Sequence, residues 1–533
     1  MGTIWYGGNI YTLQEMDHQA DAVFTRDNKI IELGSARILE EKYKDEIVSR
    51  MDLKGRTMLP GFTDSHMHLI GHGQRLISLD LSNCLSKAEV LQTVKQYAEN
   101  LDANEWLIGE GWNENLWCEP DPIVVTELDE IVPNHPVLLK RVCRHALVVN
   151  SLALKAASIN ASTENPPGGV IEKDEFGRPN GLLKDQAQEL IFEVLPAISE
   201  AYIKKALRAA IKDAHSLGLV GAHTEDLNYY GSYEKTFQAF KQVIEEEGQH
   251  FRAHLLVHHE VVDEMIKAGE YFLSGNEWIE FGAMKIFADG ALGGRTALLS
   301  HPYADDPSTS GVAIFTQQQL DDLVKKAREY KLPVAVHAIG DLAFEMVLDA
   351  IEKHPLTGEG RDRLIHAQIL RKELVLRAKK LPLILDIQPR FLASDFPWVI
   401  DRIGEEHMDY CYAWKTLLNE GLPCAGGSDA PIEPLNPLLG IHAAVTRTNI
   451  CDPEKKVFNA DEALTIYEAV CLFTKGSAYA VSHEFDRGII KEGFLADFTI
   501  LEEDIFNINP EQIPNINVSQ TVVGGEIVYD LDK

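Results

Sequence analysis

The chain has 533 residues, of which 45% are hydrophobic and 25% are charged, a composition that excludes a disordered, collagen-like or fibrous protein. Acidic residues outnumber basic ones by 82 to 50, giving a formal net charge of -32. Such a surface repels polyanions, so nucleic acid is excluded as an expected partner.

The cysteines and the N-terminus indicate where the protein works. Its seven cysteines form no C-x-x-C pair, so neither a disulfide framework nor a cysteine zinc cluster is expected. Residues 1–8 lack the basic start and apolar run of a signal peptide, and no stretch of about 18 apolar residues occurs. We therefore expect a cytoplasmic protein with no membrane partner. Whether it forms a homodimer stays open.

Both ends of the chain predict short strands. Residues 8–13 and 28–34 near the start, and 496–501 and 521–529 near the end, are short apolar runs bounded by turn residues. Neither end has enough strands for a stable core of its own. We therefore expect residues 1–57 and 483–533 to form one small β-sandwich domain.

Between the termini, residues 58–482 alternate apolar runs of strand length with amphipathic helices. One such helix is predicted over 200–217, where Ile203, Leu207 and Ile211 share a face and Gly218 ends it. Eight strands alternating with helices predict a (β/α)8 TIM-type barrel, an α/β fold. The candidate strands are residues 58–65, 219–224, 251–257, 282–288, 332–336, 363–365, 383–388 and 423–427.

A long insertion, about residues 75–182, interrupts the barrel pattern after the first strand. It contains Trp112, Trp117 and a predicted hairpin over 169–181 with Phe176 near its tip. Long loops after barrel strands lie over the catalytic face, so we expect this segment to shape substrate access. Its aromatic residues indicate either an apolar portion of the substrate or simply the core of the loop.

The motif with the clearest chemistry is LPGFTDSHMH, residues 59–68. His66 and His68 are one residue apart in an extended chain, so both imidazoles project to the same side and can reach one metal ion. The alternative is a pair of partly exposed histidines at a strand end. Their position at the end of the first barrel strand favours the metal site.

Four more residues that can bind metal follow other predicted strands: Lys285, His337, His366 and Asp429. Each has a structural alternative, since a histidine at a strand end can be satisfied in the core and an aspartate after serine can cap a helix. The C-terminal ends of barrel strands converge on one mouth. We therefore expect all of these side chains to meet there.

With these residues the chain resembles the amidohydrolase superfamily, and within it the YtcJ-like branch that includes N-substituted formamide deformylase. The resemblance covers nearly the whole sequence. It rests on PGFTDSHMHL, residues 111–151, residues 284–290, VAVHAIGD, LIHAQ, GGSDAP and GIIKEGFLADFTIL.

The resemblance implies two divalent metal ions, with zinc as the expected metal. His66, His68 and Asp429 would hold one ion, and His337 and His366 the other. Lys285, carboxylated by CO2 to a carbamate, would bridge them. A bridging hydroxide would attack the carbonyl, with Asp429 as the catalytic proton shuttle.

The implied activity is hydrolysis of the C–N bond of a non-peptide amide, or of a related ester or cyclic amide, in a small-molecule substrate. Trp112, His145 and Arg295 are candidate substrate contacts, although Arg295 fits a salt-bridged loop equally well. Three other histidines, His254, His258 and His259, are expected either to be structural or to support the metal ligands from behind.

Several alternatives stay open at this point. His223 and Glu225 also leave a strand end, and Glu225 could supply the acidic ligand in place of Lys285. The barrel could be a catalytically silent binding or regulatory protein, but an intact ligand set argues against this. A metal-assisted isomerase or lyase on the same scaffold is a further alternative, because barrel chemistry depends on the loops.

Overall fold

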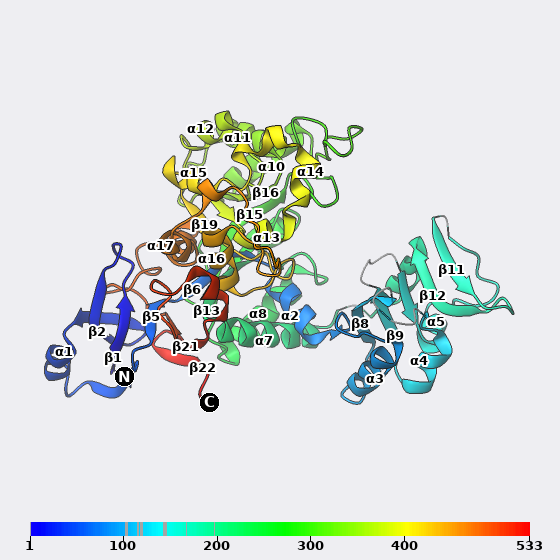
Figure 1. Ribbon diagram of the computed structural model, residues 1–533, viewed down its shortest axis with the longest axis horizontal. Coiled ribbons are helices and arrows are strands. Elements are labelled where there is room, and N and C mark those ends of the chain that lie inside the picture. Colours follow the sequence, from blue (N-terminus) through cyan, green and yellow to red (C-terminus); the bar gives the residue numbers. More distant parts are fainter. Residues whose placement is uncertain are drawn as a thin grey trace. The chain divides into compact units, whose positions relative to one another are not determined.

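The computed structural model describes residues 2–533 apart from 102–104, 115–116, 118–120, 142–145, 167 and 197 (Figure 1). The chain forms two compact units. One comprises Met1–His72 and Leu207–Lys533, and the other comprises Gly73–Ala206. The first unit contains the barrel and the sheet of the two termini. The second contains the insertion and extends beyond the predicted range of 75–182.

The barrel predicted from the sequence is confirmed. Within the described residues its sheet has eight parallel strands in the order β6-β13-β14-β15-β16-β17-β18-β19. Their bounds are β6 Phe62–Met67, β13 Leu219–Thr224, β14 Arg252–His258, β15 Ile279–Phe287, β16 Val334–Ala338, β17 Asp362–His366, β18 Leu383–Ile387 and β19 Cys424–Gly426. The segment after β19 reaches the end of β6, because Asp429 N donates to His66 O at 2.8 Å.

The first barrel strand differs most from its prediction, whereas the bounds of the others differ by up to three residues. Residues 58–65 were expected to form a single barrel strand, but the chain forms β5, Thr57–Pro60, and then β6. Gly61 separates them, and its N–H donates to Asp497 O at 2.8 Å. A Cβ atom on Gly61 would lie 2.5 Å from Val220 Cγ1, so only glycine lets the backbone approach this closely.

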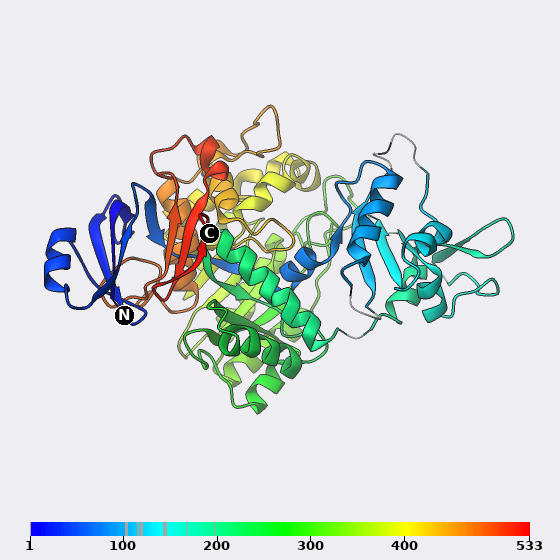
Figure 2. The ribbon, with the colours of Figure 1, turned by 90° about the horizontal axis from the view of Figure 1, so that it is seen from below.

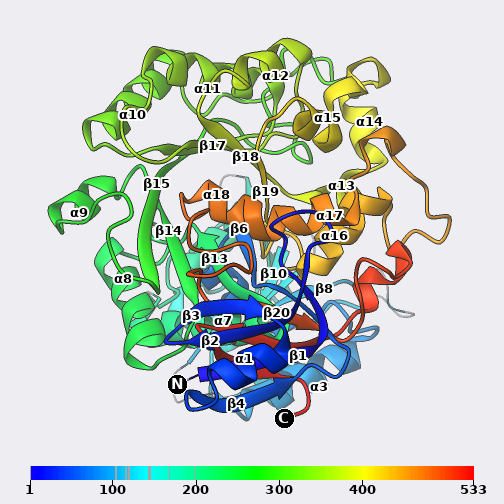
Figure 3. The ribbon, with the colours of Figure 1, turned by 90° about the vertical axis from the view of Figure 1, so that its left-hand side faces the viewer.

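Helices surround the barrel strands, as Figure 3 shows for α8 to α12. The predicted helix over 200–217 is α7, Glu200–Ser216, and its predicted apolar face is fully buried. Its end is confirmed as well, since Gly218 has a φ of 85°. The other principal helices of this unit are α8 Tyr233–Lys241, α9 Val262–Lys267, α10 Gln317–Glu329, α11 Asp341–Lys353, α12 Lys372–Ala378, α13 Pro389–Asp395, α14 Trp398–Ile403, α15 Trp414–Asn419, α16 Pro437–Thr446, α17 Ile466–Cys471 and α18 Ser477–Ala480.

Strands from both termini pair in one sheet (Figure 2), while their division into a separate β-sandwich domain stays a prediction. The order is β22-β21-β20-β5-β1-β2-β3, and β4 pairs with β1. Their bounds are β1 Gly2–Tyr11, β2 Gln19–Arg26, β3 Lys29–Gly34, β4 Ile47–Asp52, β20 Phe498–Leu501, β21 Val518–Val523 and β22 Glu526–Asp530. Trp5 and Ile10 pack with Phe498 and Val522 in its core, so residues from the two ends bury one another.

The second unit has its own sheet, in the order β11-β12-β10-β9-β8-β7. The elements are β7 Leu79–Asp80, α3 Lys87–Ala98, β8 Leu107–Trp112, α4 Val125–Ile131, β9 Val137–Arg141, β10 Ala146–Val149, α5 Ser151–Ala156, β11 Gly169–Lys173 and β12 Pro179–Asp185. Strands β11 and β12 are the predicted hairpin. Across the described parts of both units, no helix combines the length and the apolar character needed to cross a bilayer.

Candidate metal centre

The barrel brings the six predicted metal ligands to one place. His66 lies on β6, with His68 one residue beyond it, while Lys285 and His337 lie on β15 and β16. His366 ends β17, and Asp429 follows β19 by three residues. The positions agree with the rule that functional residues gather at the C-terminal ends of barrel strands.

Three of these side chains form a group that can hold one metal ion. One ligand atom from each of His66, His68 and Asp429 lies within 4.8 Å of the others. Asp429 Oδ1 is 3.6 Å from His66 Nε2 and 3.5 Å from His68 Nε2. Two imidazoles and a carboxylate converging in this way suit a divalent transition metal such as zinc.

The other two histidines continue the cluster. The ring of His66 is 5.8 Å from that of His366, which is 4.4 Å from the ring of His337. Burial lowers the pKa of His366 to about 4 and holds the pKa values of His66 and His337 well below the usual range. These imidazoles are therefore neutral at pH 7, which is the form that binds metal.

Hydrogen bonds fix the rings of three histidines and leave one nitrogen of each available. His68 Nδ1 donates to Glu225 O at 2.8 Å, and His337 Nε2 donates to Gly290 O at 2.9 Å. His366 Nδ1 donates to Gln388 Oε1 at 2.8 Å. Metal-binding histidines characteristically hold their second nitrogen in this way, so the residues fit a metal site.

Lys285 lies inside the cluster. Its Nζ is 3.3 Å from His66 Nε2 and 4.4 Å from the centre of the Phe287 ring. The side chain is fully buried, and no carboxylate of the described residues lies within ion-pair distance of Nζ. Burial lowers the pKa of Lys285 to about 8, so a substantial part of the amine is neutral near pH 7 to 8.

Two of the candidate ligands have strained backbones. His366 has a φ of 81° and Asp429 a φ of 58°, both in the left-handed region that residues other than glycine rarely adopt. Such conformations cost about 1–3 kcal/mol each and persist only where the surroundings enforce them. Their occurrence at two converging ligands is typical of a functional site.

Two of the three predicted substrate contacts have partners of their own within the structure. Trp112 is in the core of the second unit with 2% of its surface exposed, packed near Trp117. Arg295 forms an ion pair with Asp305 at 2.7 Å, as in the salt-bridged alternative. His145 lies outside the described residues. Their roles in substrate binding stay predictions.

The alternative ligand Glu225 lies beside the cluster. Its carboxylate is fully buried, and Oε2 is 3.8 Å from His68 Nδ1 and accepts a hydrogen bond from Tyr229 Oη at 2.5 Å. His223 points elsewhere, with its Nδ1 3.3 Å from Arg363 Nη2. His254 pairs with Glu280 at 2.9 Å, as expected of a structural histidine.

The sequence analysis did not identify the buried charged residues that hydrogen-bond to the backbone next to the candidate ligands. Asp64 accepts hydrogen bonds from the backbone N–H groups of His66 and Ser428, and Arg363 pairs with Asp386 at 2.7 Å. All three charged side chains are at most 1% exposed. Asp386 lies within the apolar run Leu383–Ile387, and a charge inside such a run was the signal that could have revealed the pair.

Comparisons with known proteins find relatives that match almost the whole chain. A family model described as Amidohydrolase family matches residues 50–529. The Bacillus subtilis protein YtcJ, named as an amidohydrolase, is 52% identical over 530 residues, which cover 99% of this chain and 100% of that protein. The N-substituted formamide deformylase of Arthrobacter pascens is 26% identical over 542 residues, which cover 98% of this chain and 97% of that enzyme.

A solved structure is also similar over almost the full length. It is an uncharacterized metal-dependent hydrolase from Pyrococcus horikoshii, with a TM-score of 0.80 and 29% sequence identity. The match covers 96% of this chain and 99% of that one. The similarity therefore extends beyond the barrel to the remainder of the chain.

Proposed function

This chain belongs to the amidohydrolase family, and from that premise we propose that it is a hydrolase that cleaves the C–N bond of a non-peptide amide or cyclic amide, or the related bond of an ester, with bound divalent metal ions. The observation that carries the proposal is the convergence of two imidazoles and a carboxylate, those of His66, His68 and Asp429, within 4.8 Å. A buried lysine and two more histidines complete the set.

We assign the ligands as follows. His66, His68 and Asp429 would hold one ion, and His337 and His366 the second. Lys285 would supply a carbamate oxygen to each ion: its neutral amine would add to CO2, so that an N–C bond forms while one C=O π bond of CO2 becomes C–O⁻, and the amine proton would leave to solvent. The burial that lowers the pKa of Lys285 to about 8 favours the neutral amine that this step requires.

When bound, the metal ions polarise the substrate carbonyl and lower the pKa of water. Asp429 moves the proton. Its Oδ1 faces His66 and His68, and we assign Oδ2 to take a proton from the attacking water and deliver it to the leaving nitrogen.

Metal content and turnover test the proposal. The purified full chain is expected to contain about two divalent ions, because six donors exceed what one tetrahedral ion accepts. It is then tested on N-substituted formamides, N-acyl amines, lactams and esters. The formamides come first because a relative carries that activity in its name. Chelation is expected to abolish turnover, and zinc to restore it.

A matched pair of variants separates the site from general stability. His66→Asn is expected to lose metal and activity, whereas His442→Asn, at a buried histidine of helix α16, is expected to keep both. A folded, metal-loaded chain that turns over no member of the panel would favour the silent barrel instead. One ion per chain at full activity would remove the second ion from the proposal.

The carbamate has its own test. Lys285→Ala is expected to lose metal and activity, and added acetate or propionate is expected to restore part of both by occupying the space of the carbamate. A Lys285→Ala chain that keeps its metal would show that another group, such as Glu225, bridges the ions.

A further inference from the structure

The interior of the barrel contains an arginine that the proposed chemistry does not use. Arg363 lies on β17 with 1% of its surface exposed. Its Nε donates to Asp386 Oδ2 at 2.7 Å, its Nη2 donates to Ser65 O at 2.5 Å, and the same Nη2 lies 3.3 Å from His223 Nδ1. TIM barrels normally fill this space with aliphatic side chains, and burying charges is costly.

The contact with Ser65 acts directly on a metal ligand. Ser65 O belongs to the peptide group that joins Ser65 to His66, and the N–H of that same group donates to Asp64 Oδ1 at 3.0 Å. Both polar atoms of the peptide are therefore held by buried charged side chains. Such charge-assisted hydrogen bonds are about twice as strong as neutral ones and fix orientation closely.

His66 needs this support more than the other three histidines. The rings of His68, His337 and His366 are each fixed by a hydrogen bond from one nitrogen. His66 Nδ1 is buried and has no hydrogen-bond partner among the described residues. Its orientation therefore depends on its backbone, which Arg363 and Asp64 hold.

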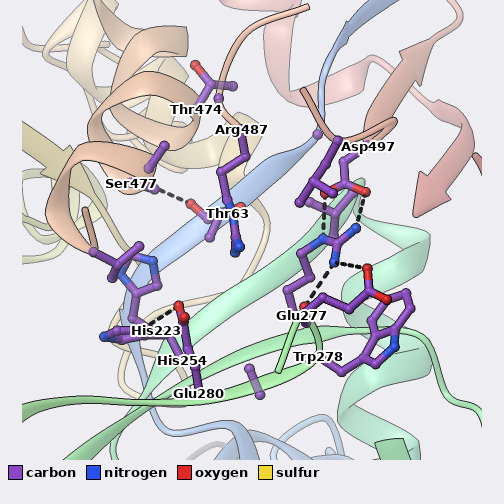
Figure 4. Close-up of a pocket in the computed structure, with 18 of the residues that line it drawn as sticks. Thr63, His223, His254, Glu277, Trp278, Glu280, Thr474, Ser477, Arg487 and Asp497 are labelled. Carbon is purple, nitrogen blue, oxygen red and sulfur yellow. Dashed lines mark hydrogen bonds and ion pairs between the residues drawn. The ribbon is translucent and has the colours of Figure 1, made fainter. Parts of the chain in front are cut away.

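A group of buried polar side chains extends this support toward the other end of the barrel. His223, His254 and Glu280 are neighbours in register on β13, β14 and β15. All three side chains line one pocket (Figure 4). His254 Nδ1 is 2.9 Å from Glu280 Oε1, and Glu280 Oε2 is 2.9 Å from His483 Nε2. The ring of His223 lies 5.2 Å from that of His254, between this group and Arg363.

We propose that Arg363 is a positioning residue of the metal centre, which fixes His66 through the Ser65–His66 peptide and is itself oriented by Asp386 and His223. The inference rests on the metal site of the proposed function. It predicts that a change at Arg363 alters metal binding even when the fold is kept.

The same barrel offers a matched control. Arg252 is 5% exposed and forms a comparable two-point contact with Asp497, at 2.6 and 2.9 Å, and both residues line the pocket described above. None of its hydrogen-bond or ion-pair partners is a candidate metal ligand or a neighbour of one. Arg252→Lys therefore reproduces the chemistry of Arg363→Lys at a site that does not support His66.

The experiment compares these variants with the wild type, each as the full chain loaded with Co2+. Arg363→Lys keeps a charge beside Asp386 but cannot reproduce the planar fork of contacts. We expect it to release the metal to chelator about 10–100-fold faster than the wild type, with a shifted cobalt absorption spectrum, because partners of ligands typically contribute this much to affinity. Arg252→Lys is expected to release the metal to chelator at a rate within about twofold of the wild-type rate.

Two results would overturn the inference: Arg363→Lys with wild-type metal release and spectrum, or Arg252→Lys with an equal effect. If Arg363→Lys does not fold, Asp386→Asn is measured instead, since it weakens the orientation of the guanidinium while keeping an acceptor. Metal release by Asp386→Asn at the wild-type rate would equally overturn it. Failure of the wild type to bind any divalent ion would instead contradict the proposed function.

Discussion

Replacing Asp64 with alanine should loosen the closure of the barrel at the metal centre. The carboxylate is fully buried and accepts hydrogen bonds from His66 N at 3.0 Å and from Ser428 N at 3.0 and 3.1 Å. It therefore joins the end of β6 to the segment that follows β19. In Asp64→Ala two buried N–H groups lose their acceptor, each at a cost of about 1–3 kcal/mol. The expected loss of stability is about 2–6 kcal/mol.

This loss of unfolding free energy corresponds to a decrease in melting temperature. Unfolding entropy is about 2.1 cal/mol/K per residue, or ~0.8 kcal/mol/K for a unit of roughly 400 residues, so Tm should fall by about 2–7 °C. Scanning calorimetry of the chelated chain measures this without a metal contribution. Asp64→Asn keeps one acceptor oxygen and should lose less. An Asp64→Ala chain with the same Tm as the wild type would refute the reasoning.

Three further outcomes are expected. Asp429→Asn should lower kcat by about 10²–10⁴-fold with KM little changed, because it removes a proton carrier; near-normal kcat on an identified substrate would exclude that role. Burial lowers the pKa of His215 to about 4 in the folded chain, whereas in the unfolded chain it is about 6.5. The unfolded chain therefore binds a proton at a higher pH, and the free energy of unfolding falls as pH drops below about 6.5. Between pH 7.5 and 5 the wild type should lose about 2 kcal/mol more than His215→Gln in denaturant unfolding, and equal losses would contradict this. Trp112→Ala should destabilise the unit 73–206 by about 3–5 kcal/mol, seen as faster proteolysis within that range, whereas unchanged resistance would show that the core tolerates the cavity.

Much of the fold and most of the proposed ligand set could be predicted because they depend on local pattern. Most strands of the barrel contain short apolar runs, and residues that can bind metal lie near the C-terminal ends of five of them. Parallel strands in a barrel must bring their C-terminal ends to one mouth. Topology alone therefore predicts that His66, Lys285 and His366 meet, without knowledge of any distance.

Sequence patterns predicted the structure less well where one segment contributes to two sheets or where one residue type fits two roles. Residues 58–65 were expected to form one strand, yet the chain passes from the terminal sheet into the barrel at Gly61. Trp112 shows the same limit, since an aromatic residue in an insertion is equally compatible with a substrate contact and with a local core. Only the packing of the second unit places it in that core.

The sequence by itself determined which residue types stand at the strand ends, and hence that a metal centre is expected. Only the tertiary structure decided which buried charges support that centre. Arg363 and Ser65 are 298 positions apart, and Asp64 and Ser428 are 364 apart. No local periodicity in the sequence predicts such pairs, because the two residues meet only when the barrel closes. Closure also excludes water, so each buried charge is then stabilised only by the partner that the fold brings to it.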